Sequence, residues 1–320
     1  MNLVNEGDNA TFTSLSGGVS SDIWRVELET GEICIKRALS KLKVAADWWA
    51  PVGRNASEVA WIEKATAVVA ACAPEILGHD VEAGLFAMPY YGPEDYKLWK
   101  NELRDGQVDL HVAQSVGSRL GQIHAATAND NVVAQQFAND EIFYDIRLEP
   151  YFVATGRAHP ELAEILEHLV SDTAAMKTVL VHGDVSPKNI LLGPEGPMFL
   201  DAECACYGDP AFDLAFCLNH LLLKCLWTPA AACNFLASYE SLVQAYFEHV
   251  CWEPRADLER RTTLLLPGLF LARVDGKSPV EYLTEEADKQ QVRRVARTLL
   301  LNPVPLLSDV GDAWREELSL

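Results

Sequence analysis

The chain has 320 residues, of which 49% are hydrophobic and 22% are charged, so it can bury one large core or two smaller ones. Its net charge of −20, from 26 basic and 46 acidic residues, argues against nucleic acid or an anionic membrane surface as a partner. The most apolar stretches are short or broken by polar residues, so we expect no membrane-spanning segment.

The first ninety residues alternate between strand-like and helix-like patterns. Residues 22–38 predict a β-hairpin, because two strand-like runs flank the turn sequence ETGE. A helix is expected from Asn55 to about Cys72, and residues 75–91 predict a second pair of strands. These elements predict a small N-terminal lobe built on an antiparallel sheet.

A glycine-containing loop lies between the first strand and this hairpin. It has the sequence LSGGVSS and includes Gly17, Gly18 and Ser20. Backbone N–H groups in such a loop can approach phosphate groups closely, so we expect the loop to cover a nucleotide.

Lys36 and Glu58 each have two interpretations. Lys36 ends the apolar strand ICIK, where it either contacts phosphates or extends its ammonium group to solvent. Glu58 either pairs with Lys36 or forms a capping box with Asn55, because the two have N-x-x-E spacing. We favour the ion pair, since Glu58 falls on the inward face of the predicted helix with Ile62.

From about Tyr96 onward the pattern is mainly helical. A proline-containing connector near residues 88–93 precedes it, so we expect one lobe over residues 1–91 and a larger helical lobe over residues 92–320. Helices are predicted over residues 110–127, 160–176, 210–227, 234–250 and 289–301.

Residues 179–216 interrupt the helices with short strands and carry most of the functional signal. Two strands flank the turn GPEG, and a pairing of Leu192 with Pro197 places Asn189 opposite Leu200. Asn189 and Asp201 then meet at the open end of the hairpin, beside the loop HGDVSPKN that carries Asp184. Oxygen ligands of this kind suit Mg²⁺ together with phosphate oxygens and water.

This arrangement fits phosphoryl transfer. That chemistry needs a carboxylate for the acceptor hydroxyl, metal ligands, and a cation on the phosphates. The carboxylate would be Asp184, the metal ligands Asn189 and Asp201, and the cation Lys36. A solvated loop with Asx-turns explains any one of the residues, but the ordered set favours catalysis.

The sequences HGDVSPKN, FLDAE and YGDPAFDLA resemble the aminoglycoside phosphotransferase and choline kinase-like group of small-molecule kinases. LSGGVSSDIWRVE, ICIKRA and LGQIHAA extend the resemblance along the chain. It implies an α+β, bilobal protein-kinase-like fold, with a small antiparallel-sheet N-lobe and a larger, mainly helical C-lobe.

The resemblance also implies roles for individual residues. Asp184 is the expected catalytic base, Asn189 and Asp201 are the expected Mg²⁺ ligands, and Asp213 is expected to brace the catalytic loop through backbone hydrogen bonds. From its position after Asp209 and Pro210, Asp213 also reads as a surface residue favoured by the helix dipole.

Further positions follow from the same resemblance. Met88 and Tyr90 fall in the hinge whose backbone reads adenine. Ser186 replaces the phosphate-contacting lysine of protein kinases, a departure that favours the small-molecule group.

Three basic residues have open interpretations. Lys188, just before the metal-binding Asn189, is either a surface lysine or a contact to substrate or phosphate. Arg273 and Lys277 lie in LARVDGKSPVEYL, late in the helical lobe, and either bind an anionic group of the substrate or form structural ion pairs.

The eight cysteines are scattered, and the first residues lack the pattern of a signal peptide, so we expect a cytoplasmic protein with reduced thiols. Cys204 and Cys206 form a lone C-x-C, for which we favour packing over metal binding.

The sequence therefore predicts an ATP- and Mg²⁺-dependent phosphotransferase that acts on a hydroxyl of a small molecule, such as an aminoglycoside, a sugar or an amino alcohol. The alternative is a nucleotide-binding pseudokinase that acts as an interaction module. A protein kinase is disfavoured, because DAECACYGDPAFD leaves no room for a long activation segment. The sequence predicts no particular oligomeric state.

Overall fold

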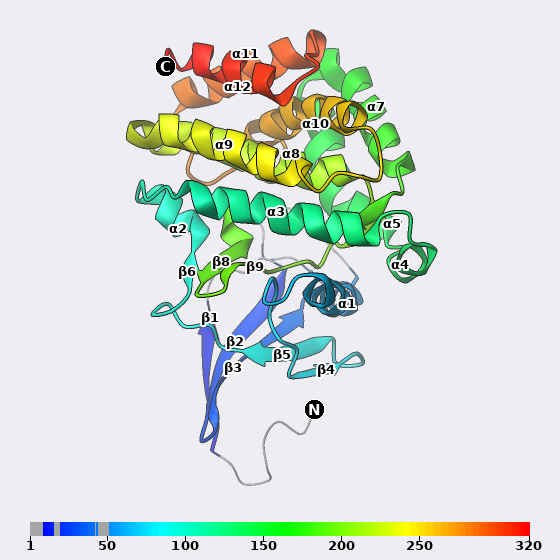
Figure 1. The fold of residues 1–320 in the computed structure, drawn as a ribbon, viewed down its shortest axis with the longest axis vertical. Helices are drawn as coiled ribbons and strands as arrows, with labels where there is room; N and C mark the ends of the chain where they lie inside the picture. Colours follow the sequence, from blue (N-terminus) through cyan, green and yellow to red (C-terminus); the bar gives the residue numbers. More distant parts are fainter. Residues whose placement is uncertain (1–8, 16–19, 42, 44–50) are drawn as a thin grey trace.

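The computed structural model of the chain describes residues 9–15, 20–41, 43 and 51–320. Its N-terminal part contains a five-stranded antiparallel sheet in the order β1-β2-β3-β5-β4 (Figure 1). The strands are β1 (Thr11–Leu15), β2 (Ser21–Leu28), β3 (Gly31–Ala38), β4 (Gly78–Asp80) and β5 (Leu85–Pro89). Both predicted strand pairs are confirmed, and Leu28 lies opposite Gly31 at the tip of the first hairpin.

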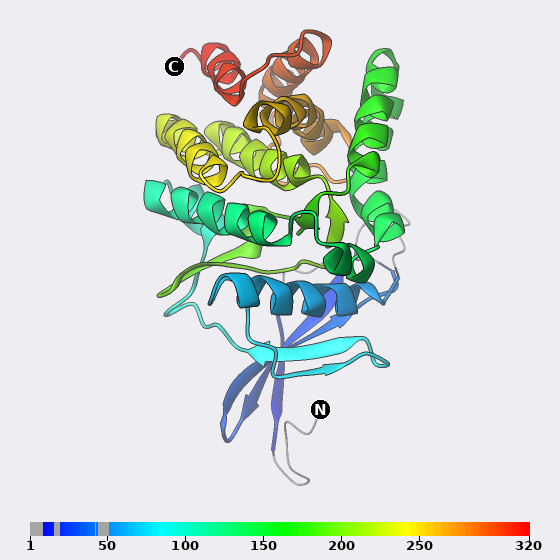
Figure 2. The ribbon, with the colours of Figure 1, turned by 45° about the vertical axis from the view of Figure 1, so that its right-hand side comes forward.

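Helix α1 (Arg54–Val68) lies between this sheet and the helical part of the molecule (Figures 1 and 2). It ends four residues before the predicted Cys72, because Val69 is extended and Ala71 has a φ of +55°. Its buried Trp61 packs edge-on against His182, with 4.6 Å between the ring centroids. The helix is thereby fixed against the loop that carries Asp184.

Two further small sheets support that loop. Strands β7 (Val179–Val181) and β10 (Cys206–Gly208) pair with each other, and β8 (Ile190–Gly193) pairs with β6 (Lys97–Leu98) and β9 (Gly196–Phe199). The predicted register of the β8–β9 hairpin is confirmed, since Leu192 lies opposite Pro197. The backbone N–H of Leu200 donates to the carbonyl of Asn189 at 2.8 Å, which continues the pairing beyond the strands.

The remainder of the described chain is mainly helical, as predicted (Figure 1). Its α-helices are α2 (Trp99–Arg104), α3 (Leu110–Thr127), α4 (Asn131–Gln136), α5 (Asp140–Phe143), α6 (Ala154–Ala158), α7 (Ala163–Ala175), α8 (Pro210–Trp227), α9 (Ala232–Phe247), α10 (Arg255–Asp275), α11 (Glu286–Leu301) and α12 (Leu307–Glu317). A π-helical stretch, η1, spans Tyr144–Val153, and the short 3₁₀ turns are η2 (Pro160–Leu162), η3 (Pro187–Asn189) and η4 (Pro229–Ala231).

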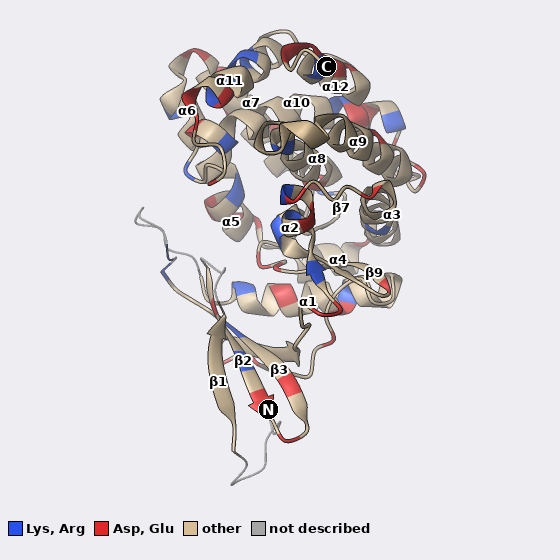
Figure 3. Cartoon of the chain, turned by 90° about the vertical axis from the view of Figure 1, so that its left-hand side faces the viewer, with Lys and Arg blue, Asp and Glu red and all other residues tan. Residues whose placement is uncertain are grey.

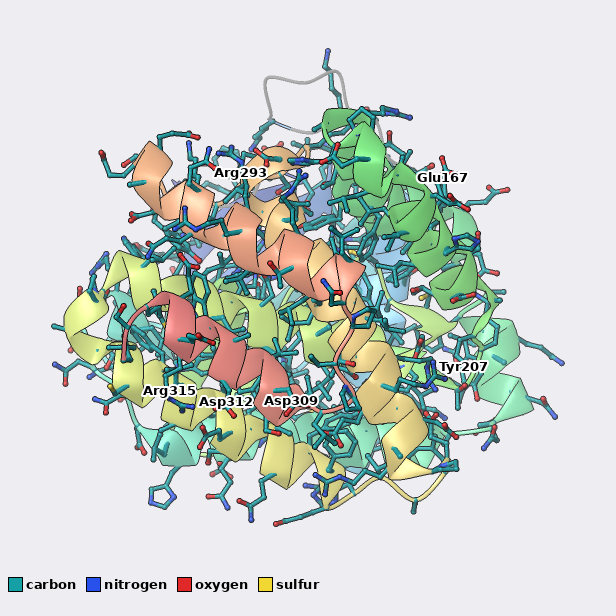
Figure 4. The ribbon with its side chains drawn as sticks, turned by 90° about the horizontal axis from the view of Figure 1, so that it is seen from above. Glu167, Tyr207, Arg293, Asp309, Asp312 and Arg315 are labelled. Atoms are coloured by element: carbon teal, nitrogen blue, oxygen red, sulfur yellow. The ribbon has the colours of Figure 1, made fainter. Side chains whose placement is uncertain are left out.

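Helix α8 is the central helix of this part and packs against α9 and α10. Its ribbon is mostly uncharged in Figure 3, whereas charged positions are frequent on α11 and α12. Figure 4 shows these two outer helices from above, with Arg293 on the first and Asp309, Asp312 and Arg315 on the second. Each helix in the described part of the chain is too short or too polar to span a lipid bilayer.

Helices α3 and α9 approach each other closely at Gly117. A Cβ atom at this position would lie closer to the carbonyl oxygen of Leu242 than side chains normally approach, and 3.2 Å from its Cα. We expect Gly117→Ala to lower the free energy of unfolding by about 2 kcal/mol, because the clash with backbone outweighs the better helix propensity of alanine.

Urea unfolding measures this effect. Gly53→Ala is the matched control, since a Cβ there meets nothing within 4 Å. If Gly117→Ala were as stable as the wild type, the close packing of the two helices would be contradicted.

Candidate active site

The loop between β7 and β8 is held in place by Asp213 of α8. Its buried carboxylate accepts hydrogen bonds from the backbone N–H groups of His182 and Gly183, each at 2.7 Å. Gly183 has a φ of +81°, and a side chain there would press on the backbone of Cys204. The helix that carries Asp213 begins as predicted, with Asp209 accepting from the N–H of Ala211. The loop conformation is therefore fixed by backbone contacts.

Asp184 is buried and is paired with two cations. Its carboxylate lies 2.9 Å from Nη2 of Arg147 and 3.2 Å from Nζ of Lys188. Burial acts to raise the pKa of Asp184, but Lys188 and Arg147 outweigh it and hold that pKa well below its usual range. The group is therefore ionised near neutral pH and can orient a hydroxyl and accept its proton as phosphoryl transfer proceeds.

Arg147 was not among the residues predicted from sequence. It is buried on η1, and its guanidinium also donates to the backbone carbonyl of Gly183. It thus fixes the loop between β7 and β8 and the Asp184 carboxylate together. No motif or spacing in YDIRLEPYF marks this arginine, because Gly183 and Asp184 lie more than thirty residues away in the chain.

Asn189 and Asp201 come together at the open end of the β8–β9 hairpin. Nδ2 of Asn189 donates to the backbone carbonyl of Asp184 at 3.2 Å, so the amide offers its oxygen to another ligand. Asp201 adopts a φ of +68°, in the left-handed region that aspartate tolerates better than most residues. Burial acts to raise the pKa of Asp201, but Lys36 and Lys188 lower it overall, so the carboxylate stays ionised.

Lys36 joins the sheet to this hairpin. Its buried ammonium group lies 2.7 Å from Oε2 of Glu58 and also contacts the Asp201 carboxylate. The capping-box alternative for Glu58 is wrong: Gly53 is the N-cap of α1, with no side-chain cap bond, and the Asn55 amide has no hydrogen-bond partner among the described residues. Two carboxylates thus share one ammonium group.

A second buried ion pair, missed from sequence, lies beside the first. Nε of Arg54 is 2.8 Å from the Glu203 carboxylate, and the same guanidinium donates to the carbonyls of Ser20 and Leu39. Arg54 opens α1, while Glu203 follows Asp201 by two residues. The pair therefore connects the end of the glycine-containing loop to the segment that carries Asp201.

Four further residues were predicted to lie at the nucleotide: Gly17, Gly18, Ser20 and Ser186. Gly17 and Gly18 lie outside the described residues. Ser20 and Ser186 are buried, and the hydroxyl of Ser186 is 3.5 Å from the Asp184 carboxylate.

The proposed hinge residues lie at the end of β5. Met88 pairs with Cys34 inside the sheet. The backbone N–H of Tyr90 donates to the carbonyl of Glu32 at 3.2 Å, so this particular donor is already used within the protein. An adenine would have to meet other backbone groups of this connector.

Arg273 and Lys277, which the sequence grouped as a basic pair, differ in burial and in their partners. Lys277 is exposed and pairs with Glu149 at 2.7 Å, which matches the structural alternative. Arg273 is buried, donates to the hydroxyls of Tyr151 and Ser278, and keeps its Nε without a partner among the described residues. Lys277 thus makes an ion pair at the surface, whereas Arg273 lies inside the helical part with one donor free within the described chain.

The oxygen atoms at the hairpin fit a divalent cation that also binds phosphate. No three His, Cys, Asp or Glu side chains of the described chain gather closely enough to hold a metal by themselves. The predicted ligands are one carboxylate, Asp201, and one amide oxygen, Asn189, and Mg²⁺ usually takes few protein ligands and completes its shell with phosphate and water. Cys204 and Cys206 are buried free thiols, as expected from packing.

A family model described as "Phosphotransferase enzyme family" matches residues 11–223 of this chain. Among curated proteins, methylthioribose kinase 2 from rice is 23% identical over 244 residues, which cover 68% of this chain and 57% of that protein. The chain thus spans little more than half the length of the curated relatives it matches.

Solved structures show the same fold at low sequence identity. An amicoumacin kinase in complex with AMP-PNP and Ca²⁺ matches with a TM-score of 0.57 and 14% identity, covering 92% of this chain and 89% of that chain. An ethanolamine kinase from Plasmodium vivax matches with a TM-score of 0.54 and 13% identity, covering 99% and 83%. The predicted α+β, protein-kinase-like fold is confirmed by these likenesses.

Proposed function

The chain belongs to the phosphotransferase enzyme family, since the family model matches residues 11–223, and we propose that it transfers the γ-phosphoryl group of ATP to a hydroxyl of a small molecule. The convergence of Asp184, Asn189, Asp201 and Lys36 at the mouth of one hairpin carries this proposal. We place the hinge near residues 88–93, since β5 ends at Pro89 and β6 begins at Lys97.

In the proposed reaction, the protein acts mainly by position and charge. Asp184 orients the acceptor hydroxyl and takes its proton. Lys36, fixed by Glu58, provides positive charge for the phosphates. Asn189 and Asp201 would hold Mg²⁺, which, when bound, neutralises charge on the phosphate oxygens.

The nucleotide and metal are part of the proposal. The amicoumacin kinase structure contains AMP-PNP and Ca²⁺. Ca²⁺ and Mg²⁺ both bind oxygen ligands, and Asn189 and Asp201 offer such ligands in this chain. We propose a cytoplasmic location, which is supported by the eight free cysteines, six of them buried.

We expect Asp201→Ala to abolish the Mg²⁺ dependence of nucleotide binding. The substitution removes the carboxylate ligand, so adding Mg²⁺ should no longer strengthen ATP binding, whereas the wild type should gain about tenfold or more. Isothermal titration of ATP with and without MgCl₂ measures the difference. Asp312→Asn, an exposed position on α12, is the control; an unchanged Mg²⁺ effect in Asp201→Ala would contradict the metal assignment.

The proposed function itself is tested by acceptor-dependent release of ADP. The acceptors are aminoglycosides, choline and ethanolamine, pentoses and methylthioribose, and hydroxy acids, each with MgATP. An acceptor that accelerates ADP release would support the proposal. MgATP binding without acceleration by any acceptor would instead favour the pseudokinase alternative.

A further inference from the structure

A row of side chains on α8 leads away from the catalytic loop. Phe216, His220 and Lys224 are four residues apart, so they lie on one side of the helix whose first turns carry Asp213. All three are buried. Because Asp213 binds the backbone of the catalytic loop, this row begins beside Asp184.

Ring and cation contacts connect the row to Asp184. Arg147, the partner of Asp184, lies 5.8 Å from the centre of the Phe216 ring, and the Phe216 and His220 rings are 5.4 Å apart. Tyr151 also packs on Phe216, and Arg273 lies over the Tyr151 ring at 5.6 Å. The contacts thus run without a break from the catalytic carboxylate to Arg273.

Around His220 and Lys224, the end of the row farther from Asp184, several buried polar atoms have no hydrogen-bond partner within the described chain. Nε2 of His220, Nε of Arg273 and the hydroxyl of Tyr282 are buried and have no hydrogen-bond partner within the described part of the chain. Lys224 is 1% exposed, and its ammonium group lies over the rings of Trp227 and Tyr282, at 4.5 and 4.7 Å. For Lys224 we find no ion pair or hydrogen bond among the described residues.

The acidic groups nearby are already paired with other cations. Asp184 is paired with Arg147 and Lys188, and Glu281 is paired with Lys100 near the surface. Glu149 is paired with Arg157 and Lys277. Lys224 and Arg273 therefore have no carboxylate of their own within the described chain.

Buried cations without counterions are costly. Burial and the positive charge of Lys100 lower the pKa of Lys224 to about 7, despite the opposing charge of Glu281. Burial, Arg273 and Lys224 likewise hold the pKa of His220 well below its usual value. An anion at this place would supply both the missing charge and the missing acceptor atoms.

We propose that His220, Lys224, Arg273 and Tyr282 bind an anionic group of the acceptor, a carboxylate or a phosphate, while the acceptor hydroxyl lies at Asp184. This inference rests on the proposed function, because it concerns the acceptor of the same reaction. The proposed acceptor is anionic, although the net charge of −20 by itself would favour a cationic one. The charge of the side chains that touch the ligand matters more than the net charge of the chain, since exposed charges beyond about 8 Å are largely screened at physiological salt.

The experiment compares matched acceptors that differ in one anionic group. Glycerate is compared with glyceramide, and ribose 5-phosphate with ribose, by MgATP-dependent ADP release. We expect at least a tenfold higher kcat/KM for the anionic member of one pair, and the pair that responds distinguishes a carboxylate from a phosphate. Equal rates for both members of each active pair would overturn the inference.

A binding measurement separates this inference from the proposed function. Inorganic phosphate and acetate are added to the MgADP-loaded protein at constant ionic strength, and the thermal midpoint is followed. We expect one of them to stabilise the wild type and Asp184→Asn, but to have no such effect on Lys224→Met. Lys177→Met, an exposed lysine paired with Asp140, should respond like the wild type.

The outcomes are distinct. Lys224→Met should fold well, since it removes an unpaired buried charge and keeps the apolar stem. Stabilisation by the anion without turnover of any acceptor would retain the anion site and overturn the proposed function. Equal stabilisation of Lys224→Met and the wild type, or of neither, would overturn the anion site.

Discussion

Asp184→Asn is expected to slow phosphoryl transfer by about 10²- to 10⁴-fold while MgATP binding stays close to that of the wild type. The amide keeps the shape of the side chain but cannot take the proton of the acceptor hydroxyl. It also loses the charge that pairs with Arg147 and Lys188. Single-turnover transfer to the acceptor found in the ADP-release assay measures the chemical step, and titration with MgATP measures binding.

The control for this variant is Asp312→Asn, because Asp312 is exposed on α12 and its ion-pair partner among the described residues is Arg315 of the same helix. It should leave both transfer and binding unchanged. Transfer by Asp184→Asn at the wild-type rate would remove Asp184 from the reaction. A parallel loss of MgATP binding would assign it to nucleotide binding instead.

Arg54→Met is expected to lower the free energy of unfolding by about 3–5 kcal/mol, because it leaves the buried Glu203 carboxylate without its partner. It also removes the donors to the carbonyls of Ser20 and Leu39. We expect MgATP affinity to fall as well, since Arg54 holds the end of the glycine-containing loop against the Asp201 segment. Urea unfolding and MgATP titration measure the two effects.

Arg315→Met is the matched control, since the ion pairs of Arg315 within the described part of the chain are with the exposed Glu240 and Asp312, and its loss should cost less than about 1 kcal/mol. The double variant Arg54→Met/Glu203→Leu removes both charges. It should recover on the order of 1–3 kcal/mol relative to the sum of the single changes. Additive effects of the two substitutions would contradict a direct coupling between these residues.

The strands around the candidate site were predictable because their signals are local. A short turn sequence sets the register of a hairpin, so GPEG placed Leu192 opposite Pro197 and brought Asn189 toward Asp201. The Lys36–Glu58 contact was accessible for a similar reason, since the inward face of α1 follows from its apolar spacing.

The missed features depend on contacts between distant segments. Arg54 and Arg147 are identified by partners far away in the chain, which no spacing reveals. Helix α10 was not predicted, because Pro267 lies inside it and normally ends a helix. Its burial among other helices overrides that local preference.

The hydrogen bonds from the backbone of His182 and Gly183 to Asp213 fix the first turns of α8 to the loop around Asp184. From there, Phe216, His220 and Lys224 follow along one side of the same helix at intervals of about one turn. If the acceptor lies along this side of α8, substitutions at positions 216, 220 and 224 would change which acceptor fits. The backbone position of each residue relative to Asp184 would stay the same.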